Sequence, residues 1–95
     1  MIIGVLQAQL LIRESRSLKD KRRVVKSLKD RLANRFNISI AEVEDQDLWQ
    51  KAVLGICTVS NDRQRVNSIL DQVVDFIENT NLAQVTDSQI EIMNI

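Results

Sequence analysis

The amino-acid sequence predicts a ferredoxin-like βαββαβ two-layer sandwich, an α+β fold in which two helices cover one face of a four-stranded antiparallel sheet. Two observations predict it. Apolar residues follow strand patterns along four segments and recur every three to four residues along two others, in the order strand, helix, strand, strand, helix, strand. The first and third strands are the most apolar, as central strands of this fold should be. The chain has 95 residues, no proline and no low-complexity linker, so we expect one domain over residues 1–95.

The first strand and the first helix are predicted by a change in apolar spacing. Residues 2–13 alternate with a period of two, which places Leu6 and Leu10 on the more apolar face of a strand. Ser17 is a suitable N-cap for a helix that runs from about residue 18 to residue 35, with Asp20 at its third position. We expect one buried stripe on this helix, made of Leu18, Val24, Val25, Leu28, Leu32 and Phe36.

The second and third strands are expected on either side of a polar loop. Residues 37–44 form a short strand with a bulge near Ala41, because apolar residues fall on both of its faces. Residues 45–50 form the loop. Residues 52–59 are apolar on both faces, which is typical of a central strand that is buried on two sides.

The last third of the chain predicts a second helix and a final strand. The segment Ser60–Asp62 caps a helix that ends near Asn79, and residues 85–95 form the strand. The buried face of this helix is expected to hold Val66, Ile69, Leu70, Val73 and Ile77. This topology leaves one face of the sheet without helices, and Val5 and Leu11 of the first strand belong to that open face.

Charge is distributed unevenly along the chain, although the net charge is zero. Residues 13–35 contain ten of the 13 basic residues and three carboxylates, so this segment carries +7. Residues 36–95 contain the other three basic residues and ten carboxylates, which gives −7. Blocks of one sign often mark interaction surfaces, so the basic segment indicates a partner of negative charge.

Five cations of the first helix fall within about a third of its circumference at ~100° per residue. They are Lys19, Arg22, Arg23, Lys26 and Lys29. One interpretation is a surface that binds the phosphates of nucleic acid or another polyanion. The other is a solvated face whose long side chains cover the edge of the core. A sequence pI near 6.2 and only 3% aromatic residues argue against single-strand readout from the sheet, and leave contact with a backbone or with double-helical RNA.

The segment that leads into the first helix offers a sixth candidate, Arg16. Together with Ser15, Ser17 and the free N–H groups of the helix, it is suited to bind one phosphate. Plain capping of the helix by Ser17 is the alternative.

Other residue groups predict structural roles. Four carboxylates near the polar loop lack the spacing and the glycine of a calcium loop, which favours a solvated acidic loop and predicts no metal site. They are Glu42, Glu44, Asp45 and Asp47. Trp49 is expected to anchor the loop by packing rather than to stack on a ligand. Cys57 lies in the central strand and is expected to be an inert core thiol.

The residue types present predict a protein without catalytic activity. The chain has no histidine, which excludes Ser–His and Cys–His nucleophile pairs and histidine metal ligands. Its only glycines, Gly4 and Gly55, do not form a glycine-rich phosphate loop. We therefore expect no enzyme and no cofactor.

Four motifs in order resemble those of the YlxP-like family of small bacterial proteins. They are Ser15–Arg23, Ile40–Val43, Gln46–Gln50 and Val59–Asp62, and they cover nearly the whole chain. The resemblance implies a ferredoxin-like fold and a gene often placed among genes for translation factors and ribosome maturation. It implies no catalytic residue. The gene context that the resemblance implies favours RNA or the ribosome as partner.

From these features we expect a cytoplasmic accessory of translation or ribosome maturation that binds structured RNA through its first helix. A single cysteine suits a reducing compartment, and the apolar N-terminal segment is too short to span a membrane. The alternative is a protein–protein module without a nucleic-acid partner, which includes pairing with a second copy. Val5 and Leu11 favour a homodimer through the open sheet face, whereas Gln7 and Gln9 favour a monomer.

Overall fold

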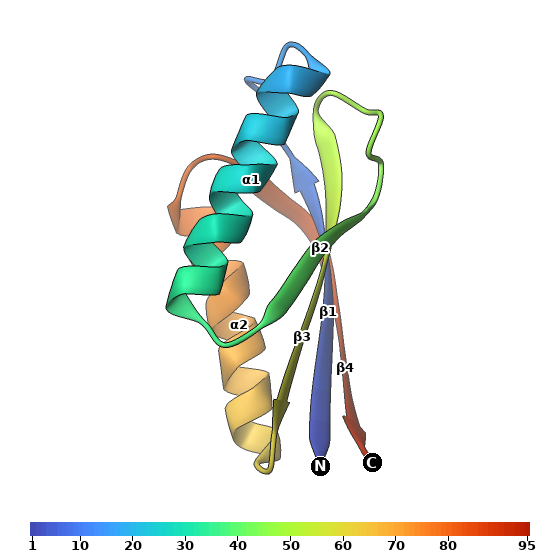
Figure 1. The fold of residues 1–95 in the computed structure, drawn as a ribbon, viewed down its shortest axis with the longest axis vertical. Coiled ribbons are helices and arrows are strands. Elements are labelled where there is room, and N and C mark those ends of the chain that lie inside the picture. The colour runs from blue at the N-terminus through green and yellow to red at the C-terminus, as the bar shows by residue number, and fades with distance from the viewer.

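A computed structural model describes all residues 1–95 and confirms the predicted βαββαβ order. The elements are β1 (Ile2–Leu11), α1 (Leu18–Arg35), β2 (Ser39–Glu44), β3 (Lys51–Ser60), α2 (Arg63–Asn79) and β4 (Gln84–Asn94). The sheet has the order β2-β3-β1-β4, and every neighbouring pair is antiparallel. Both helices lie on one side of the sheet, and the other face is open (Figure 1).

The core lies between the helices and the sheet and is almost entirely aliphatic. Leu6, Ala8 and Leu10 alternate along β1 with more exposed residues and are at most 2% exposed. They belong to a cluster of 16 buried residues to which both helices and the two central strands contribute. This burial confirms the predicted apolar face of β1.

Both helices begin at the predicted caps. The Ser17 hydroxyl accepts a hydrogen bond from the backbone N–H of Asp20, and the Asp20 carboxylate accepts one from the backbone N–H of Arg16. This reciprocal arrangement satisfies two N–H groups at the start of α1. At α2 the Asp62 carboxylate accepts from the backbone N–H groups of residues 64 and 65. Each cap therefore ends the preceding loop at a defined residue.

Some sequence predictions about the strands are wrong in detail. The bulge in β2 lies at Val43 rather than near Ala41, because the pairing with β3 shifts between Glu42 and Glu44. Strand β3 is buried along the side that faces the helices, whereas on the open face only Val53 is buried. On the open face, Val59 is 57% exposed and Cys57 is half-buried, so Cys57 is not a core thiol.

Helix α2 packs closely against the sheet at Gly4. A Cβ atom at this position would overlap the Val66 side chain of α2 and would lie 2.9 Å from Leu70 Cδ1. Glycine is therefore required here for the close approach of helix and strand, and not for an unusual backbone conformation.

The molecule is elongated, with principal extents of 42 × 21 × 18 Å. Strand β1 runs along the sheet beside β3 and β4, and both chain termini meet at one end of it (Figure 1). There, Ile95 donates a backbone hydrogen bond to Met1. Neither helix combines the length and the apolar character that a membrane crossing requires.

Candidate nucleic-acid interface

The exposed side of α1 carries the cations that the sequence placed on one arc. We call the side chains of Lys19, Arg22, Arg23, Lys26 and Lys29 the basic face. The first four are exposed and Lys29 is half-buried at the edge of the core. The buried stripe of α1 lies on the other side of the helix and includes Val25, Leu28 and Leu32.

Most cations of the basic face lack a carboxylate partner. The molecule contains two ion pairs, and one of them joins Lys26 to Asp30 at 2.8 Å on the same helix. The hydrogen bond to Asp30, with its charge, raises the pKa of Lys26 above its ordinary value. No carboxylate lies within ion-pair distance of Lys19, Arg22 or Arg23. Their mutual repulsion is therefore relieved only by solvent, salt or a partner.

The phosphate pocket expected around Arg16 is not formed by its neighbouring serines. Ser15 is 3% exposed, and its hydroxyl donates to the backbone carbonyl of Ser17. The Ser17 hydroxyl and the Asp20 carboxylate already accept hydrogen bonds from backbone N–H groups at the start of α1, those of Asp20 and Arg16. A carboxylate at this position also repels a second anion. The side chain of Arg16 is exposed and adds one more cation next to the basic face.

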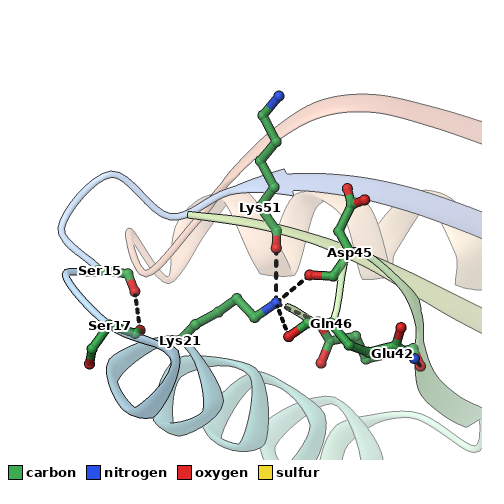
Figure 2. A network of polar contacts seen from close by, with 7 residues as sticks. All are labelled: Ser15, Ser17, Lys21, Glu42, Asp45, Gln46 and Lys51. Atoms are coloured by element: carbon green, nitrogen blue, oxygen red, sulfur yellow. Dashed lines mark hydrogen bonds and ion pairs between the residues drawn. The ribbon is translucent and has the colours of Figure 1, made fainter. Parts of the chain in front are cut away.

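Lys21 is the residue that sequence reasoning missed. Its side chain is fully buried, and its Nζ donates to the backbone carbonyls of Asp45, Gln46 and Lys51 at 2.6, 3.1 and 3.1 Å (Figure 2). It follows the spacing of the buried stripe, four residues before Val25. That spacing was the available signal, but lysine is rarely buried unless it is paired.

Glu42 of β2 completes the surroundings of Lys21. Its Oε2 lies 3.0 Å from Lys21 Nζ, and the side chain of Glu42 is 16% exposed. The three carbonyls use the three ammonium hydrogens, so this oxygen is at ion-pair distance but has no hydrogen bond of its own. Charge attraction, rather than hydrogen bonding, therefore connects β2 to α1 at this point.

The loop between β2 and β3 is fixed to the start of α1 by several contacts. Asp45 has a positive φ of 61°, and its carbonyl accepts from the backbone N–H of Leu48 as well as from Lys21. The side-chain amide of Gln50 donates to the carbonyls of Arg13 and Ser15. These bonds hold residues 45–50, which we call the Trp loop, beside the segment that leads into α1.

Trp49 does not anchor the loop as the sequence analysis expected. Its side chain is 56% exposed, and that of Leu48 is 46% exposed. The buried lysine takes the anchoring role instead, since its three hydrogen bonds fix the backbone of Asp45 and Gln46 and that of Lys51, where β3 begins. The acidic residues of the loop and of β2 do not converge, and no group of three or more potential metal ligands lies together anywhere in the structure.

The open sheet face is the other exposed surface with a distinct character. Val43, Val59 and Met93 are 43%, 57% and 40% exposed. Val43 also lies over Gly55, and the two residues line a hollow of about 350 Å³ together with Val5 of β1. The polar residues Gln7 and Gln9 of β1 are also exposed on this face.

Similarity to known proteins agrees with the resemblance stated from the motifs. The chain is 39% identical over 77 residues to the uncharacterized protein YlxP of Bacillus subtilis (strain 168), covering 81% of this chain and 84% of that protein. A de novo designed protein, Foldit4, has a TM-score of 0.56 at 11% identity and covers 100% of this chain and 99% of its own. A structural-genomics protein, YJCS, gives 0.51 at 13% identity, with 98% of each chain covered.

At such low identity, the two solved structures show the fold alone. The family assignment comes from the sequence matches. Residues 3–90 match the model of a family described as "Protein of unknown function (DUF503)", which spans most of the chain and all four motifs. The chain therefore belongs to the DUF503 family, together with the YlxP protein that it resembles.

Proposed function

We propose that the protein is a non-enzymatic accessory of translation or ribosome maturation that binds structured RNA through the basic face of α1. The observation that carries the proposal is the set of exposed cations without carboxylate partners, Lys19, Arg22 and Arg23. The gene context implied by the family resemblance supports RNA as the source of the negative charge. Phosphates that neutralise these cations release counterions, which drives binding.

The distribution of the other side chains supports contact with a double helix rather than with single strands. Phe36 and Phe76 pack edge to face at 6.0 Å beside the helices, and Arg35 lies 5.5 Å from the Phe76 ring. The open sheet face therefore has no aromatic residue on which bases could stack. The basic face extends over residues 19–29, about 15 Å along the helix axis at ~1.5 Å per residue. Such a surface suits the sugar–phosphate backbone of an RNA double helix, which is recognised by its charge and shape.

The rest of the molecule restricts how RNA approaches. Residues 36–95 carry −7, and α2 has three acidic residues after Arg65 but no further basic one. RNA is therefore repelled from the α2 side and attracted to α1 alone. This orientation explains how a protein with a pI near 6.2 can bind a polyanion.

The test is the salt dependence of binding to a short RNA duplex. If about four phosphates are neutralised, log K falls with log salt at a slope of about −3, or roughly a hundredfold between about 50 and 200 mM salt. Changing Lys19, Arg22 and Arg23 to Ala should remove most of this slope, because these cations have no internal partner.

The matched control removes three exposed cations from elsewhere on the surface, namely Arg31, Lys51 and Arg65. This variant has the same net charge as the first one, so the two differ only in where the charge is lost. The proposal predicts a nearly unchanged slope for the control. Equal slopes for the two variants would mean that binding follows net charge and not the basic face.

The second candidate function is self-association through the open sheet face. The exposed apolar side chains of Val43, Val59 and Met93 favour it. This face lies opposite α1 and α2, so pairing through it leaves the basic face free (Figure 1). The two functions are therefore compatible.

A further inference from the structure

Trp49 is the most unusual exposed side chain in this protein. It is the only tryptophan, and more than half of its surface is open to solvent, with Leu48 beside it 46% exposed. Large aromatic side chains normally bury most of their area, and exposed ones are enriched at binding sites. The position therefore calls for a ligand that covers the indole.

The Trp loop is held in place without any help from Trp49 itself. Lys21 donates two hydrogen bonds to carbonyls of the loop and a third to the first residue of β3, and Gln50 donates two to the segment before α1. The carbonyl of Asp45, at a positive φ of 61°, accepts from Lys21 and from the backbone N–H of Leu48, which fixes the start of the loop. A fixed loop presents its indole without a large ordering cost on binding.

The Trp loop lies at the N-terminal end of α1 (Figure 1). Lys21, which holds the loop, stands in sequence between Lys19 and Arg22 of the basic face, so the loop and the basic face share the first turns of the helix. The bonds from Gln50 to the carbonyls of Arg13 and Ser15 set this position. The loop itself carries two carboxylates, Asp45 and Asp47, and no cation, so charge does not attract a phosphate to it. A contact between Trp49 and RNA therefore depends on stacking by the indole.

We propose that Trp49 stacks on an unpaired base that adjoins the RNA double helix bound by α1. This inference rests on the proposed function, because the basic face holds the phosphates and brings the base within reach. An indole stacks on any base, with a gain that depends little on sequence. The protein would then recognise the junction between a duplex and an unpaired segment, such as a hairpin loop or a bulge, in preference to a continuous duplex.

The experiment compares two RNAs with the same stem, a hairpin with an unpaired loop and a blunt duplex. The intrinsic fluorescence of the protein reports on Trp49 alone, since no other tryptophan is present. Emission should be quenched when the hairpin is titrated and should change little with the duplex. Replacing Trp49 by Ala should weaken hairpin binding about fivefold to a hundredfold, the range for loss of one stacked base, and leave duplex binding and its salt slope unchanged.

Two further variants sharpen the comparison. Trp49→Phe should retain part of the preference for the hairpin, because a smaller ring still stacks. Leu48→Ala removes a neighbouring exposed apolar side chain and should leave the preference intact. Hairpin binding without quenching, or equal weakening of hairpin and duplex by Trp49→Ala, overturns the stacking inference alone. Absence of binding to either RNA overturns the proposed function as well.

Discussion

Lys21 determines the local structure at the end of the molecule where α1 begins. A fully buried ammonium group is stable only when its three hydrogens are bonded, and here three backbone carbonyls accept them. Two of those carbonyls belong to the loop and the third to the first residue of β3, and the ion pair with Glu42 adds β2. One side chain of α1 therefore contacts β2, the loop and β3. Together with the side-chain amide of Gln50, this residue positions the loop that carries Trp49.

Replacing Lys21 by Met should destabilise the protein by about 3–5 kcal/mol, the usual loss when one partner of a buried ion pair is removed. The methionine keeps the apolar stem but leaves three carbonyls without their hydrogen-bond donor and the Glu42 carboxylate without its counter-ion. Urea unfolding measures the loss. In a Glu42→Gln background the same substitution should cost less, because no buried charge is left alone. Strictly additive effects would contradict a coupling between the two side chains.

The sequence could not reveal these residue-scale features. Lys21 has the spacing of a buried residue, but only the carbonyls of Asp45, Gln46 and Lys51, 24 to 30 positions away, make its burial favourable. The exposure of Trp49 has the same cause, because Lys21 fixes the loop and leaves the indole without a packing role. The basic face, by contrast, depends only on helical periodicity, so it was predictable.

At the scale of elements, α2 packs closely against β1 at Gly4. Gly4→Ala should destabilise the protein by about 1–3 kcal/mol, the usual loss when an extra carbon is forced into a well-packed core. The new methyl group would overlap the Val66 side chain of the helix. Thermal or urea unfolding of Gly4→Ala, Val66→Ala and the double variant measures the coupling, and the double variant should lose less than the sum.

Gly55 provides the matched control on the open face. A Cβ atom there would lie 2.9 Å from Cγ1 of Val43, a side chain that is 43% exposed and can move aside. Gly55→Ala should therefore change stability by less than Gly4→Ala. A loss at Gly55 as large as the loss at Gly4 would contradict this, because it would show that the open face restricts an added methyl group as much as the helix-covered face does.

The order and type of all six elements were predictable because their signals are local. The caps at Ser17 and Asp62 and the apolar spacing of both helices depend on neighbouring residues only. The register of the strands depends on partners far away in the sequence. That is why the bulge at Val43, and a second irregularity in the pairing of β1 with β4 near Gln9, were misplaced or missed.

At the scale of the whole molecule, the fold separates two surfaces of different chemistry. The helix layer carries the basic face on α1, and the opposite surface is a sheet face with exposed valines (Figure 1). Two strands of ten residues, one of eleven and one of six, about 4.8 Å apart, span on the order of 600 Å². Each partner in a standard protein interface buries about 800 Å². The open face alone is therefore somewhat smaller than a standard half-interface, so pairing of two copies would use nearly all of it.

Symmetric pairing through this face would place the two α1 helices on opposite outer surfaces, where each basic face could bind RNA. We expect Val43→Lys with Val59→Lys to convert a dimer into a folded monomer, because both side chains are already substantially exposed and only the interface would bury the new charges. Equilibrium sedimentation at tens of micromolar measures the mass, and far-UV circular dichroism checks the fold.

The control is Leu48→Lys, because Leu48 is an exposed apolar residue outside the open face. This variant should leave the mass unchanged. A wild-type protein that sediments as a monomer would contradict pairing through the open face and would leave RNA binding by α1 as the remaining proposal. In that case the two exposed glutamines of β1, Gln7 and Gln9, keep the open face sufficiently hydrated.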